Sequence, residues 1–312
     1  MSRYTRFYIY GILGAIGGLF AWQLSNILGL SFTRSLFLSE VIVGALMGLL
    51  IGFFIGFAEG IAGQNLLFGL RKSLISALLG AVGGAIALPL AEGVFLFVGG
   101  QAWTRPLGWA IFGLLTGLAT GITGGAQMWK GGLGGLLGGL LGGALLEATR
   151  LIFKDTLIGK GAGLILLGTA VGVFIALIVF ILSRVWFEVT SGKLKGMEFI
   201  LDKFLPESGP TAYIGNSPMK SDIVLMDPEI SAQHAILKGH GNHFTLKDIS
   251  MSGTYVNGKK VEQVRLSSGQ HIRMGKTEFI YHEKRQICEK ESTQLLSSLP
   301  CLLWCLLALH DH

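Results

Sequence analysis

Six apolar stretches, each close to the length that crosses a lipid bilayer, fill residues 1–185 of this 312-residue chain. The hydrocarbon core of a bilayer is about 30 Å thick and takes about 20 apolar residues of α-helix. Lipid offers no hydrogen-bond partners, so a spanning segment must satisfy its backbone internally, as a helix does. We therefore expect an α-helical polytopic membrane bundle, with transmembrane helices at 8–30, 37–58, 73–99, 105–125, 132–153 and 159–183.

The glycines of this half follow a repeating pattern. The motif LGAIGG at 13–18 recurs as LGAVGG at 79–84, and a related LGGLLGG stands at 137–143, which indicates three copies of a helical hairpin. Small residues at every fourth position, such as Gly48 and Gly52, let helices approach closely in lipid. Two interpretations remain open: a tightly packed anchor, or a channel or transporter whose Gly-rich helices move.

Ionisable residues inside the apolar stretches bear on the second interpretation, because charges at membrane depth are costly and usually mark a pathway. Glu92 is the deepest of them, and Pro89 just before it can kink the helix. Glu147 and Arg150 lie one helical turn apart, where they can pair with each other. These three charged residues form a candidate intramembrane polar site.

The charges divide the chain into two halves. Residues 1–185 hold 11 Lys or Arg against 5 Asp or Glu, whereas the remainder holds 14 of each. Counted over the loops on each side of the predicted helices, with Lys193 and Lys195 just beyond residue 185 included, the basic residues favour a cytoplasmic location for both termini, eight against five. No Lys/Arg cluster with interleaved aromatic residues accompanies this excess, so nucleic acid is not an expected partner.

The second half has a different composition, with short alternating apolar runs that are typical of an all-β sandwich. We expect a transmembrane domain at 1–185, a linker at 186–195, a β domain at 196–285 and a tail at 286–312 with a short apolar run. The predicted strands are 197–203, 211–214, 222–225, 234–238, 243–248, 254–256, 263–266, 271–274 and 278–282.

Several sequence blocks of this β domain come in a recognisable order. They are YIGNSPMKSDIVL at 213–225, ISAQH at 230–234, DISMSGTYVNG at 248–258 and IRMG at 272–275. In order and spacing, they resemble a forkhead-associated (FHA) domain. The resemblance implies a two-sheet β-sandwich whose loops at one end bind a phosphothreonine peptide, although function has to be argued from the site itself.

The resemblance also assigns roles to single positions. The family has a Gly-Arg pair whose guanidinium contacts the phosphate, and here the pair is Gly215-Asn216. Ser231 keeps the family's phosphate-binding hydroxyl, whereas Ala232 stands where the family often has Arg or Asn. Because a planar guanidinium donates two charge-assisted hydrogen bonds, its loss weakens the pocket. Lys220, in the same loop as Asn216, is a candidate for a displaced positive charge.

The remaining family positions concern the loop that holds the peptide backbone. Where the family has Asn, this chain has Ser252, and Ser250 precedes it, so both are candidate partial substitutes. The resemblance gives His234 a bracing role beneath the loops. It gives a turn-forming role to Gly253, Asn257 and Gly258.

Catalysis and metal binding have no basis in the sequence. All seven histidines lie beyond residue 233, and Cys288, Cys301 and Cys305 have no metal-site or disulfide-framework spacing. We expect no enzyme and no cofactor. We expect instead a membrane-anchored FHA protein that recruits a phosphothreonine-containing partner, or an unmodified one, to the cytoplasmic surface. The architecture that this resemblance suggests implies the plasma membrane of a bacterium. The alternative is a channel or transporter regulated by the FHA domain.

Overall fold

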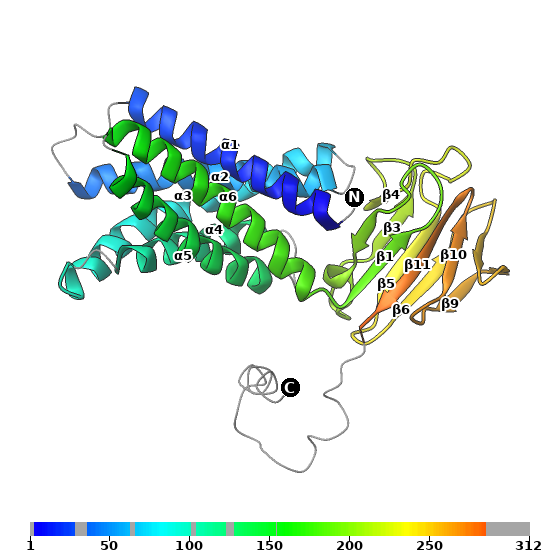
Figure 1. The fold of residues 1–312 in the computed structure, drawn as a ribbon. Helices are drawn as coiled ribbons and strands as arrows, with labels where there is room; N and C mark the ends of the chain where they lie inside the picture. Colours follow the sequence, from blue (N-terminus) through cyan, green and yellow to red (C-terminus); the bar gives the residue numbers. More distant parts are fainter. Residues whose placement is uncertain are drawn as a thin grey trace, which may run out of the picture.

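The computed structural model describes residues 3–28, 36–62, 66–100, 104–122, 128–153 and 155–284. It consists of a helical bundle followed by a β-sandwich that lies against one end of the bundle (Figure 1). The predicted tail at 286–312, with its apolar run and its three cysteines, lies outside the described residues.

Each of the six predicted apolar stretches contains a helix. They are α1 (Arg3–Ile27), α2 (Leu36–Ala62), α3 (Leu66–Phe97), α4 (Arg105–Ile122), α5 (Met128–Ile152) and α6 (Thr156–Ile181). Within the described residues, five of the helices are long and apolar enough to cross a membrane, and α4 is not among the five. At 18 residues, α4 is about 27 Å long. The predicted polytopic helical bundle is confirmed.

The helices form a closed ring, because each packs on its neighbours in the chain and α6 packs back on α1. In three pairs within this ring, glycine faces the backbone of a glycine on the other helix: α1 with α6, α2 with α3, and α4 with α5. In the α2–α3 pair, a methyl group at Gly48 would collide with the carbonyl of Gly80. The same arrangement joins Gly113 to Gly135 in the α4–α5 pair. The predicted Gly-rich repeats therefore correspond to a contact that recurs around the ring.

The sandwich has a six-stranded sheet in the order β2-β1-β11-β10-β7-β8 and a five-stranded sheet in the order β4-β3-β5-β6-β9. The strands are β1 (Val185–Val189), β2 (Glu198–Ile200), β3 (Ala212–Gly215), β4 (Ile223–Val224), β5 (Ala235–Gly239), β6 (Phe244–Asp248), β7 (Thr254–Val256), β8 (Lys259–Val261), β9 (Gln263–Arg265), β10 (His271–Met274) and β11 (Thr277–Glu283). Alternate residues of the strands point into one apolar core, which includes Phe187, Leu237 and Tyr281. All nine predicted strands are present, and the predicted sandwich is confirmed.

The segment predicted as a linker, 186–195, needs correction because most of β1 lies in it. This strand pairs antiparallel with β11 over its whole length, from Val185 opposite Glu283 to Val189 opposite Phe279. The residues of β1 alternate between buried and half-buried. They follow α6 so closely that the sequence does not show where the helical periodicity of the apolar residues ends and the alternation of a strand begins. Only three residues, 182–184, separate helix α6 from the sandwich.

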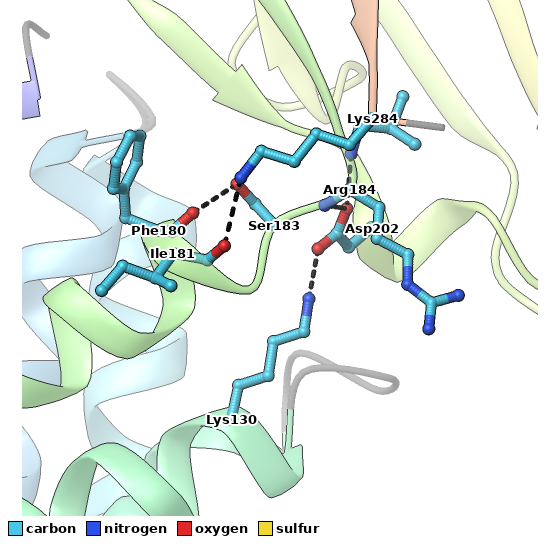
Figure 2. A network of polar contacts seen from close by, with 8 residues as sticks. Lys130, Phe180, Ile181, Ser183, Arg184, Asp202 and Lys284 are labelled. Carbon is cyan, nitrogen blue, oxygen red and sulfur yellow. Dashed lines mark hydrogen bonds and ion pairs between the residues drawn. The ribbon is translucent and has the colours of Figure 1, made fainter. Parts of the chain in front are cut away.

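A buried ion pair fixes the sandwich to the bundle (Figure 2). Lys130, near the start of α5, contacts the carboxylate of Asp202, which lies in a short 3-10 helix (Asp202–Phe204) after β2. Both side chains are only 5% exposed. The other carboxylate oxygen of Asp202 accepts hydrogen bonds from the backbone N–H groups of Arg184 and Val185, each at 2.9 Å. One carboxylate therefore joins α5 to the first residues of the sandwich.

Two further contacts cross the same junction. The Nζ of Lys284, just after β11, donates to the carbonyl of Ile181 at 3.1 Å (Figure 2). The guanidinium of Arg6 in α1 donates to the carbonyl of Glu198 in β2 at 3.3 Å. Contacts from α1, α5 and α6 thus hold the sandwich in one orientation.

The strand register shows which end of the sandwich points away from the bundle. Strand β1 leaves the bundle at Val185, and its partner β11 returns to the bundle at Glu283, so Thr277 at the start of β11 lies at the far end. Strand β10 then places Met274 opposite Thr277 and also opposite Thr254. The loop that precedes Thr254 therefore lies at the far end, away from the membrane domain.

Candidate functional site at the far end of the sandwich

Three loops meet at this end: the β3–β4 loop (216–222), the β4–β5 loop (225–234) and the β6–β7 loop (249–253). The first two are joined by hydrogen bonds. The backbone N–H of Asn216 donates to the carbonyl of Ser231 at 3.1 Å, and Oγ of Ser221 donates to the carbonyl of Ala232 at 2.6 Å. A Cβ at Gly215 would lie 2.6 Å from Oγ of Ser221, so this close approach requires glycine.

The side chain of His234 joins all three loops from below. It is completely buried, and its Nδ1 accepts a hydrogen bond from the backbone N–H of Ser231 at 3.4 Å. The proton is therefore on Nε2, which lies 3.3 Å from the carbonyl of Gly253 and 3.2 Å from Oγ of Ser250. Burial lowers the pKa of His234, while the hydrogen bond to Gly253 opposes this shift. His234 is thus neutral and positioned to brace the loops.

The hydroxyl of Ser250 is fully engaged within the β6–β7 loop. It donates to the Asp248 carboxylate at 2.8 Å and accepts from the backbone N–H of Gly253 at 2.9 Å. Burial raises the pKa of Asp248, but hydrogen bonds from Ser250 and Thr254 together lower it by more. The pKa of Asp248 therefore lies below its ordinary value. This geometry favours a scaffold role for Ser250 rather than the predicted peptide contact.

The other predicted contact residues are accessible. Asn216 and Ser231 are half-buried and neighbours through their backbones, whereas Ala232, Ser252 and Lys220 are exposed. The carbonyl of Lys220 accepts a hydrogen bond from the side chain of Gln233 at 2.9 Å, which anchors its loop. Their assignment as phosphopeptide contacts stays a prediction.

Sequence reasoning missed a cation, Lys260, that lies beside this site. Gly253 has a φ of +87°, and a Cβ built on it would lie 2.9 Å from the Nζ of Lys260. Lys260 belongs to β8, which the sequence analysis did not predict, and it pairs with Tyr255 of β7. The turn at Asn257-Gly258, where both residues have positive φ, is the signal that could have revealed this hairpin and its lysine.

Sequence reasoning also missed two methionines in the loops. Met219 in the β3–β4 loop is 83% exposed, and Met251 in the β6–β7 loop is 102% exposed. Methionine is flexible and polarizable, and exposed methionines are common on surfaces that bind partners of variable shape. The far end of the sandwich therefore presents an apolar surface beside its polar groups.

The predicted intramembrane residues lie elsewhere, at the end of the bundle opposite the sandwich. Glu92, Glu147 and Arg150 line one cavity there. The predicted Glu147–Arg150 pair is present, with Nη1 of Arg150 3.0 Å from Oε1 of Glu147. Arg105, which the sequence analysis did not single out, contacts the other oxygen of Glu147 at 3.6 Å.

Comparison with known proteins identifies the sandwich. Residues 213–275 match the family model of the FHA domain. The chain is 34% identical over 94 residues to the glycogen accumulation regulator GarA of Mycolicibacterium smegmatis, covering 30% of this chain and 55% of that protein. It is 34% identical over 96 residues to an oxoglutarate dehydrogenase inhibitor of Corynebacterium diphtheriae, covering 30% and 62%. The chain thus spans less than two thirds of the length of these curated relatives.

A solved structure is similar over the same share of the chain. The crystal structure of an FHA domain from Chlamydia trachomatis is 34% identical and covers 33% of this chain and 100% of that one, with a TM-score of 0.30. The family-model match confirms the FHA resemblance of the β domain, and it applies to that part of the chain.

Proposed function

We propose that this chain, whose C-terminal sandwich is an FHA domain, recruits a phosphothreonine-containing protein to the cytoplasmic surface of a membrane. The helical bundle would hold the protein in the bilayer, and the FHA loops would hold the partner. The observation that carries this proposal is the set of loops around Ser231, which His234 braces from below and which face away from the bundle. A partner can reach these loops while the bundle is embedded in lipid.

The phosphate would be bound without the family's arginine. Ser231 offers its hydroxyl, Lys220 lies within the loops and Lys260 lies beside them. Lysine is a point charge that cannot reproduce the two-pronged contact of arginine. Each charge-assisted hydrogen bond that is lost costs about 1.5 to 3 kcal/mol. Confinement to a membrane raises the local concentration of the two partners, which offsets a weak site.

An unmodified partner is a second candidate, and the exposed methionines favour it. Met219 and Met251 lie on two different loops of the site and leave almost all of their apolar surface open to solvent. A peptide with apolar side chains would cover this surface, and it would need no phosphate. Only the phosphothreonine-containing partner requires a phosphate group for binding, so one experiment separates the two candidates.

That experiment measures binding of peptide libraries to the full chain in lipid nanodiscs. The libraries are identical except that a central threonine is either phosphorylated or unmodified. We expect preferential binding of the phosphorylated library, weakened by about tenfold or more in Ser231→Ala, which corresponds to the loss of one hydrogen bond to a charged group. Ser208→Ala, at an exposed serine outside the loops, is the matched control.

The phosphothreonine mechanism would be contradicted if both libraries bound equally and Ser231→Ala left this binding unchanged. If a Met219→Ser/Met251→Ser variant also reduced the binding, recognition of an unmodified partner would take its place. Absence of binding to either library by the folded chain would contradict both.

A further inference from the structure

A cavity of about 470 Å³ opens at the end of the bundle that faces away from the sandwich. Every one of the six helices contributes to its lining, from Trp22 in α1 to Leu164 in α6. Its volume lies within the range of 300 to 1,000 Å³ that is typical of pockets for small molecules.

The cavity ends inside the bundle on packed apolar side chains. Met47 and Leu146 line it and also belong to the apolar core of the bundle, where each is 2% exposed. Below them the core continues with Ile51, Phe112 and Val171, which are fully buried. This apolar core closes the inner end of the cavity in this conformation. An ion would have to cross the core to pass through the bundle, so we interpret the cavity as a binding pocket and not as part of an ion pathway.

Apart from Glu147, the acidic and the basic side chains that line the pocket lie on different helices. Glu40 of α2 and Glu92 of α3 lie on adjacent helices and close enough to interact electrostatically. Within the described part of the chain, neither of these carboxylates has an ion-pair or hydrogen-bond partner. The ring of helices places α2 and α3 side by side, so this wall of the pocket is acidic.

The basic residues occupy the wall formed by the next three helices. Arg105, Arg150 and Lys160 belong to α4, α5 and α6, which are neighbours in the ring. Glu147 contacts both arginines and neutralises only one of these three positive charges. The pocket is therefore close to neutral as a whole, with its unpaired carboxylates on α2 and α3 and its basic side chains on α4, α5 and α6.

Aromatic side chains complete the lining. The guanidinium of Arg105 lies over the ring of Phe95 of α3, 5.0 Å from its centroid, which holds this cation where the basic wall meets the acidic one. Trp22 also lines the pocket, and its indole Nε1 is buried without an acceptor among the described residues. A buried N–H without a partner is costly, and a bound polar molecule would supply the acceptor.

From this division of charge, we infer that the pocket binds a small zwitterion with an ammonium group at one end and an anionic group at the other. The ammonium would lie between Glu40 and Glu92, and the anionic group would face Lys160 and Arg105. Two sources provide this chemistry: a phosphoethanolamine lipid head group in the leaflet opposite the sandwich, or a free amino acid or dipeptide. This site is separate from the FHA loops and does not depend on the function proposed for them.

The test is a titration of the full chain in nanodiscs of phosphatidylglycerol, which carries no ammonium group. The soluble probes are phosphoethanolamine and the dipeptide alanyl-alanine, and ethanolamine and inorganic phosphate serve as probes with only one kind of charge. Binding is followed by tryptophan fluorescence, because Trp22 and Trp109 line the pocket, and by the thermal unfolding midpoint. We expect saturable binding of a zwitterion at least tenfold tighter than that of either single-charge probe.

Variants separate the two walls. Glu40→Gln/Glu92→Gln should weaken zwitterion binding by about tenfold or more, and so should Lys160→Gln, which changes an exposed side chain and leaves the bundle packing intact. Glu207→Gln, at an exposed carboxylate of the sandwich, should bind like the unmodified chain.

The outcomes are distinct for the two sources. Competition by nanodiscs that contain phosphatidylethanolamine, together with binding of phosphoethanolamine but not of alanyl-alanine, would identify the lipid head group. The opposite pattern would identify a soluble zwitterion. Absence of saturable binding, equal affinity for the single-charge probes, or unchanged affinity in both wall variants would overturn the inference.

Discussion

Lys130 and Asp202 form an ion pair that is almost completely shielded from solvent, although they belong to different domains and lie 72 residues apart in the chain. Asp202 also accepts hydrogen bonds from the backbone N–H groups of Arg184 and Val185. One of its carboxylate oxygens therefore contacts helix α5, and the other contacts the start of the sandwich. A loop of three residues alone would leave the sandwich free to turn. The ion pair removes this freedom and links the position of the FHA domain to helix α5.

Breaking this pair should destabilise the junction strongly. Asp202→Asn leaves the ammonium of Lys130 buried without its counter-charge, and loss of one partner of a buried pair costs about 3 to 5 kcal/mol. Lys130→Met/Asp202→Asn should cost less than Asp202→Asn alone, because no uncompensated charge remains buried. Chemical unfolding of the full chain in detergent measures both, with Lys193→Met at an exposed site as control. Equal destabilisation of the single and double variants would show that the pair does not couple the two residues.

The FHA loops should lose stability as the pH falls below neutrality. Burial lowers the pKa of His234 below its ordinary value of 6.5, so the unfolded chain takes up a proton more readily than the folded chain does. The stabilisation is therefore fully present above pH 6.5 and is lost as the pH falls from 6.5 through the pKa of the folded state. Thermal unfolding between pH 8 and pH 5 should show this decrease, and His234→Gln should reduce its slope. A His234→Gln profile parallel to that of the control His271→Gln would contradict the assignment.

The glycine contacts between helices predict opposite effects for two similar substitutions. Gly48→Ala places a methyl group against the backbone of Gly80, and overpacking of this kind costs about 1 to 3 kcal/mol. Gly93→Ala adds the same group where no atom lies within 4 Å, and alanine favours a helix over glycine by about 0.5 to 1 kcal/mol. Thermal unfolding in the same detergent should therefore separate the two variants. Equal midpoints would mean that close approach of α2 and α3 contributes nothing to stability.

The absent arginine predicts a gain of function. Asn216→Arg would place a guanidinium beside Ser231, and one or two charge-assisted hydrogen bonds should tighten phosphothreonine binding by about tenfold or more. Lys260→Ala should weaken it, and Lys238→Ala, at an exposed lysine of β5, should leave it unchanged. Affinities are measured with a phosphothreonine peptide selected from the library. A tighter complex in Asn216→Arg that is equally tight for the unphosphorylated peptide would show that phosphate is not what the new side chain contacts.

Local sequence patterns determined the two kinds of domain. The length of each apolar stretch predicts a helix because only a helix satisfies its own backbone in lipid. The alternation of apolar residues predicts strands such as β5 and β6 because side chains point to opposite faces of a sheet. The FHA blocks around Gly215 and His234 could also be identified from the sequence, because the residues of each block are close together in the chain.

Only the tertiary structure decided where distant residues meet. Strand β1 was hidden beside α6, and its partner β11 begins 88 residues after Val189. Lys260 reaches Gly253 because of a hairpin, and Ser250 turns inward because Asp248 and Gly253 occupy its hydroxyl. The charged pocket takes residues from six helices, and its division into two walls depends on the order of those helices around the ring. The periodicity of apolar residues depends on the local structure of one segment, whereas these contacts depend on how several segments pack against one another.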